Sequence, residues 1–223
     1  MVPRAVGRRM LHAMLHVQDM EKSLDFYRGL GMEVLSCNRR SNGASTAFVG
    51  FGKLRDMENF ALELSKPKDP APRVDMGSFK ALVLSGSAES LLEDPDGYPI
   101  RREDASEPKQ VRALHLGTVD LKSSMEFYQR LGMEMHPEGL RYPSGPPTYL
   151  CLEESSSVDL GSAFDHLVIS TEDVDKAFKA LQEHGVSVIL EPTVMFGLKI
   201  MGVLDHDGHK VYLVDESDFQ KQA

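Results

Sequence analysis

Short apolar stretches alternate along this chain with segments in which apolar residues recur at helical spacing. Residues 10–17 are apolar over the length of a strand, and in residues 24–30 the apolar side chains recur every three positions, which predicts an amphipathic helix. Asp19 is suited to the N-cap of that helix, and Gly31 is suited to its end. The pattern therefore predicts a strand followed by a helix near the start of the chain.

The succession of a strand, a helix and three further strands recurs about four times along the sequence. The other predicted strands are residues 46–51, 60–64, 113–119, 149–152, 164–170, 186–190, 198–204 and 210–215, and the other predicted helices are residues 121–131 and 174–185. The segment DHDG, residues 205–208, predicts a hairpin turn in which the glycine adopts a positive φ. The order indicates an α+β fold built from tandem βαβββ modules.

The helical motif occurs twice. Residues 19–35 align without a gap on residues 120–136, and the similar segments 93–100 (EDPDGYPI) and 204–211 (LDHDGHKV) close the two halves. Eight positions of the first pair are identical in the two copies: Asp19, Ser23, Phe26, Tyr27, Leu30, Gly31, Met32 and Glu33. Such an internal repeat indicates a duplication. We therefore expect two fused domains, residues 8–103 and 110–219, joined by a charged segment that contains proline.

The second module is shorter than the others. Few residues separate its first strand, within residues 78–87, from the closing segment 93–100, whereas the fourth module has room for a helix and two strands in the same interval. We expect the second module to lack part of its helix and one strand.

Composition excludes several classes of protein. The 223 residues carry a formal net charge of −9, which disfavours binding to the phosphates of nucleic acids. Apolar runs fall short of the roughly 20 residues that a membrane-spanning helix needs. Cys37 and Cys151 lack CxxC spacing, so neither a disulfide framework nor a zinc–thiolate site is expected. We expect a cytoplasmic protein with a small-molecule substrate and without nucleic-acid or membrane partners.

Residues 8–35, the segments TAFVGFG and FALELS, and the closing segments EDPDGYPI and LDHDGHKVYLVDESDF together resemble two-domain glyoxalase I (lactoylglutathione lyase) of the vicinal-oxygen-chelate superfamily. The resemblance extends over residues 8–219. It implies two curved sheets that form cups, one from modules one and four and one from modules two and three. Because both cups can form within one chain, we expect a monomer. The implied reaction converts the hemithioacetal of methylglyoxal and glutathione to lactoylglutathione.

The resemblance also places a divalent metal (nickel, zinc or cobalt) in the cup of modules one and four. His12, Glu63 and His166 occupy three of the family's four ligand positions, and Tyr212 occupies the fourth, where the family has Glu. Nitrogen and oxygen ligands suit these ions. A Lewis acid is needed because a proton leaves the carbon next to a carbonyl and an enediolate forms. Without a carboxylate at Tyr212, Glu63 is the candidate for proton transfer.

Other positions depart from the family pattern. His16 stands where the family has an arginine that holds a carboxylate of glutathione, and Pro67 stands where it has an asparagine. We expect His16 and Tyr212 to contact the substrate. Without the two family anchors, glutathione as co-substrate should bind more weakly than in the family. In the cup of modules two and three the ligand positions fall on Phe79 or Lys80, Arg101, Ala113 and Cys151. That set does not suit a metal, so we expect one retained site.

Three functions are compatible with this sequence. The first is a metal-dependent lyase or isomerase of the glyoxalase I type that uses the retained site. The second is a non-catalytic protein of the same fold that binds a metal, a small ligand or a partner, which the missing glutathione anchors favour. The third is an iron-dependent ring-cleaving dioxygenase of the superfamily. It ranks last because that branch takes its carboxylate from the final strand, which here carries Tyr212.

Overall fold

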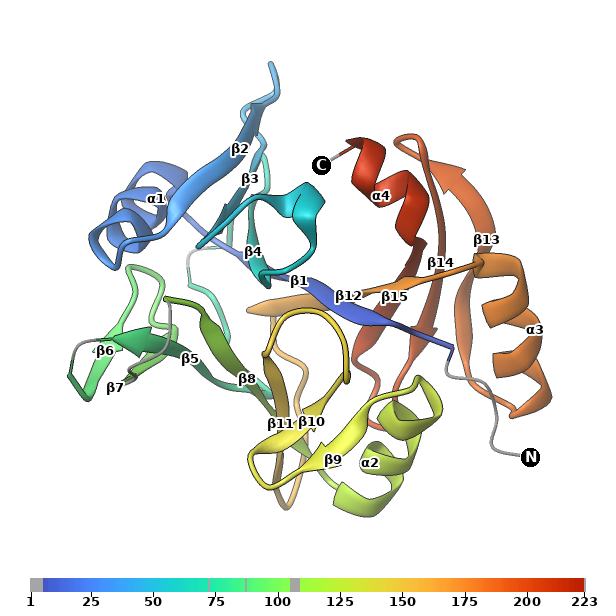
Figure 1. Ribbon diagram of the computed structural model, residues 1–223. Coiled ribbons are helices and arrows are strands. Elements are labelled where there is room, and N and C mark those ends of the chain that lie inside the picture. The colour runs from blue at the N-terminus through green and yellow to red at the C-terminus, as the bar shows by residue number, and fades with distance from the viewer. Residues whose placement is uncertain (1–5, 72, 87, 105–108, 223) are drawn as a thin grey trace.

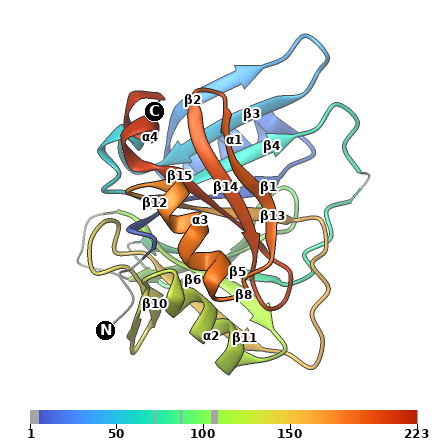
Figure 2. The same ribbon diagram turned by 90° about the vertical axis from the view of Figure 1, so that its right-hand side faces the viewer.

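Two curved sheets form the molecule, and each is built from two modules (Figure 1 and Figure 2). The structure is a computed structural model that describes residues 6–71, 73–86, 88–104 and 109–222. Strands from both halves of the sequence contribute to each sheet. Residues 105–108 of the expected connecting segment lie outside the described residues.

The eight-stranded sheet combines the first module with the fourth, in the order β13-β14-β15-β12-β1-β4-β3-β2. Its central strands β1 and β12 pair antiparallel. The first module comprises β1 (Arg9–His16), α1 (Met20–Gly29), β2 (Glu33–Arg39), β3 (Ser45–Gly50), the short 3-10 helix η1 (Leu54–Asp56) and β4 (Ala61–Lys66). The fourth comprises β12 (Phe164–Thr171), α3 (Val174–Glu183), β13 (Val188–Met195), β14 (Leu198–Leu204) and β15 (Lys210–Asp215), and α4 (Glu216–Gln222) follows it.

The seven-stranded sheet combines the second module with the third, in the order β6-β7-β5-β8-β11-β10-β9. The second module comprises β5 (Phe79–Gly86), β6 (Ser90–Glu93) and β7 (Pro99–Asp104), and its described residues include no helix. The third comprises β8 (Val111–Thr118), α2 (Leu121–Arg130), β9 (Glu134–His136), β10 (Gly139–Arg141) and β11 (Tyr149–Glu154). Both the shortened second module and the pairing of modules one with four and two with three are confirmed.

Local signals in the sequence explain where the helices begin and end. The Asp19 side chain caps α1 by accepting a hydrogen bond from the backbone N–H of Lys22 at 3.3 Å, and Asp120 caps α2 through Ser123 at 3.0 Å. Gly31 follows α1 with a φ of 89°, in the left-handed region that favours glycine. The predicted cap and stop of α1 are therefore confirmed.

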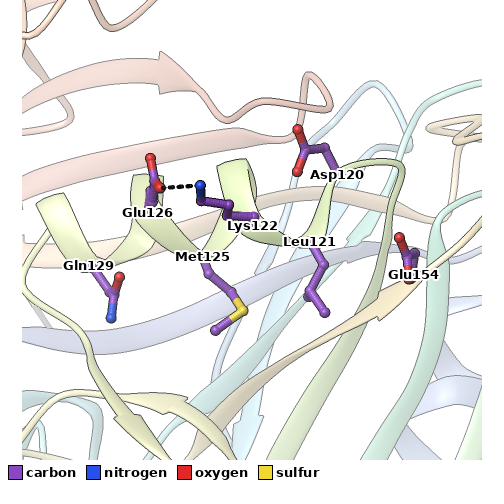
Figure 3. Close-up of a pocket in the computed structure, with 7 residues that line it drawn as sticks. All are labelled: Asp120, Leu121, Lys122, Met125, Glu126, Gln129 and Glu154. Carbon is purple, nitrogen blue, oxygen red and sulfur yellow. Dashed lines mark ion pairs between the residues drawn. The ribbon is translucent and has the colours of Figure 1, made fainter.

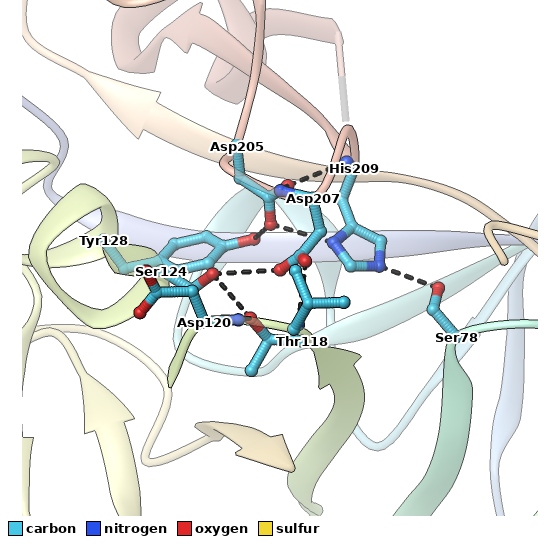
Figure 4. Close-up of polar contacts among 9 residues, drawn as sticks. Ser78, Thr118, Asp120, Ser124, Tyr128, Asp205, Asp207 and His209 are labelled. Carbon is cyan, nitrogen blue, oxygen red and sulfur yellow. Dashed lines mark hydrogen bonds and ion pairs between the residues drawn. The ribbon is translucent and has the colours of Figure 1, made fainter. Parts of the chain in front are cut away.

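The closing turn of each half is hydrogen-bonded to the helix of the same half, as Figure 4 shows for the second half. In the second half the Tyr128 hydroxyl donates to Asp205 at 2.9 Å. The Ser124 hydroxyl donates to Asp207, also at 2.9 Å. The equivalent bonds of the first half run from Tyr27 to Asp94 at 3.2 Å and from Ser23 to Asp96 at 3.3 Å. These contacts explain why the same serine, tyrosine and aspartate positions recur in both copies of the repeat.

The main apolar core is continuous across both sheets and includes the inner faces of α1, α2 and α3. A separate small apolar cluster lies inside the eight-stranded cup, where α4 lies between the β2–β3 and β13–β14 arms (Figure 1). Within the described residues, no helix is both long enough and apolar enough to cross a membrane.

Candidate metal centre in the eight-stranded cup

His12 and His166 are brought together by irregular pairing of the two central strands. Between β1 and β12 the register shifts at two places, which leaves Leu11 and Asp165 as extra residues of β-bulges immediately before the two histidines. Glu63 comes from β4, which pairs parallel with β1 and places Glu63 opposite Met14. Since Met14 is two positions beyond His12, Glu63 lies on the same face of the sheet as His12.

The three predicted ligands converge in the cup. Nε2 of His12 lies 3.3 Å from Oε2 of Glu63. The ring centroids of His12 and His166 are 6.3 Å apart. One ligand atom from each of the three residues lies within 4.8 Å of the others, so a single ion can contact all three.

The three side chains lie in a cavity of about 750 Å³ whose walls are largely apolar. The His12 side chain is 7% exposed. Phe48 meets the His12 ring edge-on at 5.0 Å between centroids, and Phe219 from α4 stacks on it at 6.0 Å. The β13–β14 hairpin adds Ile189, Met195, Phe196, Leu198 and Ile200 to the wall. This enclosure strengthens electrostatic interactions at the floor of the cup.

Burial and pairing set the charge state of these groups. Burial lowers the pKa of His12, although the hydrogen bond to Glu63 opposes the change. Burial also disfavours ionisation of Glu63, but the hydrogen bond with His12 and the charge interactions with His12 and His166 together outweigh it, so the pKa of Glu63 is lowered. A neutral imidazole and an ionised carboxylate are the forms that bind metal. The donor set of two imidazoles and one carboxylate therefore fits a divalent nickel, zinc or cobalt ion.

A second group of charges adjoins His166. Asp165 pairs with His166 at 2.6 Å, with the Lys210 ammonium at 2.9 Å and with Nε2 of His16 at 3.7 Å. The contacts with His16 and His166 hold the pKa of the Asp165 carboxyl well below its usual range. The same contact with Asp165 raises the pKa of His16.

Tyr212 and His16, the two predicted substrate contacts, occupy different places. The Tyr212 ring meets the His166 ring edge-on, with centroids 4.8 Å apart, and lines the large cavity. Gly202 lies opposite Tyr212 on β14, where a Cβ atom would come within 2.6 Å of the ring. His16 instead lines a smaller pocket of about 300 Å³ with Asp165 and Lys210.

Among the described residues, the seven-stranded cup lacks a comparable set of candidate metal ligands. The register of β5 against β8 leaves Lys80 as the extra residue of a bulge and puts Ala81, not Phe79 or Lys80, at the position equivalent to His166. The expected position, Phe79 or Lys80, was therefore wrong. Lys80 and Asp165 are equivalent bulge residues of β5 and β12, so the segments that begin at Phe79 and Phe164 align without a gap. The other equivalent positions are Arg101, Ala113 and Cys151. Within the described residues, no group of candidate metal ligands lies in this cup.

Two other features resemble sites but are explained otherwise. Asp205, Asp207 and His209 cluster in the closing turn, where the Asp205 carboxylate already accepts hydrogen bonds from Tyr128, from His209 and from two backbone N–H groups (Figure 4). A groove of about 480 Å³ runs beside α2, between that helix and the end of β11 (Figure 3). Most of its lining comes from α2, with Glu154 from β11, and the ion pair drawn there joins Lys122 to Glu126. Neither feature offers free groups that converge on a ligand.

Several residues of the cavity were not identified from the sequence. Asp165 contacts His166 because of the bulge, which no local sequence signal marks, since neighbouring residues of a regular strand point to opposite faces. Phe219 covers the cup through tertiary packing of α4. Arg40 and Lys66 lie at the ends of β-strands and bring two positive charges to the cavity wall.

Comparison with known proteins agrees with the fold. The family profile of the Glyoxalase/Bleomycin resistance protein/Dioxygenase superfamily matches residues 9–73 and 110–213, which is more than half of the chain. The chain belongs to this superfamily. Relatives within the superfamily include a lactoylglutathione lyase of Arabidopsis thaliana, 29% identical with 99% of this chain and 96% of the relative covered. A lactoylglutathione lyase of Oryza sativa subsp. japonica is 28% identical, with 99% and 94% covered.

Solved structures of the superfamily show the same arrangement. Glyoxalase I from Zea mays superposes with a TM-score of 0.84 at 26% identity, covering 96% of this chain and 94% of that chain. The α+β fold of tandem modules is thereby confirmed, as is the resemblance to two-domain glyoxalase I.

Proposed function

We propose that this protein is a metal-dependent lyase of the lactoylglutathione lyase type, acting on the hemithioacetal of a 2-oxoaldehyde and glutathione. The observation that carries the proposal is the convergence of His12, Glu63 and His166 in a largely apolar cavity. Relatives named lactoylglutathione lyase match the chain over nearly its whole length, which supports the same activity.

In this proposal His12, Glu63 and His166 hold the ion, which supplies positive charge to the enediolate that forms when the substrate loses a proton. Glu63 takes the proton from the carbon next to the carbonyl and returns it to the neighbouring carbon. Its ionised state at neutral pH, which follows from the lowered pKa, suits it to accept that proton. The apolar walls exclude water and so protect the intermediate from reaction with solvent.

The substrate would extend from the ion toward the cavity mouth. Tyr212 adjoins His166 and would contact the reacting end of the substrate. Arg40 and Lys66 line the same cavity and can attract the carboxylates of glutathione in place of the missing arginine and asparagine anchors. A contact of His16 with the substrate stays a prediction, as do the monomeric state and the cytoplasmic location.

The non-catalytic alternative is less favoured, because the full-length relatives are named as lyases and the three ligands remain together. A ring-cleaving dioxygenase is also less favoured, since the final strand brings the Tyr212 phenol to the site and not a carboxylate.

The test is to strip the protein of metal and add back nickel, zinc, cobalt or iron with the methylglyoxal–glutathione adduct. We expect turnover with at least one of the first three ions. Turnover should be lost in Glu63→Gln even where metal still binds, and metal binding should be lost in His12→Ala and His166→Ala. The absence of turnover with every ion would contradict the proposal.

A further inference from the structure

Asp165 lies on the same side of its strand as its neighbour His166. It is the extra residue of a β-bulge, because Met14 pairs with His166 while the next residue, Leu15, pairs with Phe164. Both Asp165 and His166 consequently line the large cavity. Two consecutive side chains of one strand are thereby brought into contact.

The two oxygens of Asp165 have different partners. Oδ2 lies 2.6 Å from Nδ1 of His166, and Oδ1 lies 2.9 Å from Nζ of Lys210 on the neighbouring strand β15. An ammonium group can only donate, so Oδ1 accepts the hydrogen bond from Lys210. The positive charge of Lys210 also keeps the Asp165 carboxylate ionised, and an ionised carboxylate can only accept hydrogen bonds. The proton between Asp165 and His166 therefore belongs to Nδ1 of the imidazole. In the neutral imidazole, Nε2 of His166 then keeps its lone pair free.

His12, the equivalent histidine on β1, has no such partner. The bulge residue before it is Leu11, which cannot accept a hydrogen bond. Nδ1 of His12 is buried and has no hydrogen-bond partner in the described structure. The two histidines of the cup therefore differ. Nδ1 of His166 faces the Asp165 carboxylate, whereas the carboxylate beside His12, that of Glu63, lies at its Nε2.

We propose that Asp165 is a positioning residue of the metal centre, which fixes the tautomer and ring orientation of His166, and that Lys210 holds its carboxylate in place. The proposal rests on the proposed function in one respect, namely that His166 is a metal ligand. Removal of a carboxylate behind a ligating histidine typically weakens metal binding by about 10–100-fold. We expect a loss in that range here.

The tautomer can be tested without metal, by two-dimensional ¹H–¹⁵N NMR of the imidazole nitrogens in the metal-free protein. In the wild type, His166 should carry its proton on Nδ1. In Asp165→Ala the proton should move largely to Nε2, the position that an unconstrained neutral imidazole prefers. A structural role of Asp165 alone would leave the tautomer unchanged.

Metal binding gives a second readout. Zinc titration of Asp165→Ala should show an affinity about 10–100-fold weaker than that of the wild type. The matched control is Glu153→Ala, which removes a carboxylate that pairs with His115 at the same 2.6 Å but in the seven-stranded cup. That control should leave zinc affinity unchanged. If Asp165→Ala fails to fold, Asp165→Asn keeps the shape and should show a smaller loss in the same direction.

Three outcomes would overturn the proposal: a wild-type His166 protonated on Nε2, zinc affinity in Asp165→Ala within about two-fold of the wild type, or no zinc uptake by the wild type. Failure of the lyase function looks different. In that case zinc binding and its dependence on Asp165 persist, but the methylglyoxal–glutathione adduct is not turned over.

Discussion

The ring of Phe219 stacks on the imidazole of His12, with 22° between their planes and 6.0 Å between their centroids. Phe219 belongs to α4, which covers the open side of the eight-stranded cup (Figure 1). It packs there in a small apolar cluster with Leu11, Met57, Val168 and Val214. The last helix of the chain therefore shields one face of a proposed metal ligand from water.

Replacing Phe219 should weaken the packing of α4 against the cup. Phe219→Ala removes most of the apolar contact of α4 with the cup, and we expect a loss of about 2–4 kcal/mol in the free energy of unfolding. Hydrogen exchange should accelerate first at the amides of α4. Phe219→Leu, which keeps part of the apolar contact, should lose less. Unchanged exchange in α4 would show that the ring does not anchor the helix.

Introducing a carboxylate at the fourth ligand position should strengthen the site. In Tyr212→Glu, a carboxylate would adjoin His166 at the position where the family resemblance implies a fourth ligand, and a further anionic ligand should strengthen binding of a divalent ion. We expect tighter zinc or nickel binding and faster turnover than in the wild type. Tyr212→Phe is the control and should leave metal affinity near the wild-type value. Weaker binding in Tyr212→Glu would argue against the assigned position.

Asp94 should make stability depend on pH. Burial raises the pKa of its carboxyl from 3.8 to about 6, so ionisation of Asp94 is disfavoured in the folded protein. The protonated Asp94 carboxyl contributes stability to the folded protein. This contribution is complete below the pKa of Asp94 in the unfolded chain and is lost as the pH rises through its pKa in the folded protein. Relative to Asp94→Asn, the wild type should lose about 2 kcal/mol in unfolding free energy between pH about 4 and about 7. Denaturant titrations across this range would contradict the expectation if the difference stayed constant.

The hydrogen bonds between helices and closing turns should contribute to stability without affecting the metal centre. Tyr128→Phe removes the bond to Asp205 at a fully buried position, and we expect a loss of about 1–2 kcal/mol in unfolding free energy. Tyr27→Phe should behave similarly because its bond to Asp94 is equivalent. Metal affinity should not change in either variant. A variant that loses metal while keeping its stability would show that the turns influence the cup directly.

Much of the fold could be predicted because its signals are local or repeated. The caps at Asp19 and Asp120 and the recurring closing turns define module boundaries. The spacing of apolar residues, helical in some segments and strand-like in others, defines the order of elements within a module. The family resemblance then implies how the modules pair, and the shortened second module is visible as a missing length of chain.

The candidate site was predictable only in part, because its remaining features depend on tertiary structure. The proposed ligands His12, Glu63 and His166 stand at positions that a family pattern can mark. By contrast, the contact of Asp165 with His166 depends on a bulge. The cover by Phe219 depends on how a terminal helix packs, and neither feature has a periodic signal in the sequence.

The most direct test is a nickel titration of the metal-free protein with the methylglyoxal–glutathione adduct present, following formation of lactoylglutathione. With one working cup, the rate should rise in proportion to added nickel and stop rising at one equivalent per chain. The same titration of His166→Ala should show little turnover at that point. No turnover at any nickel concentration would contradict the lyase function, and a rate that rises to two equivalents would contradict the single site.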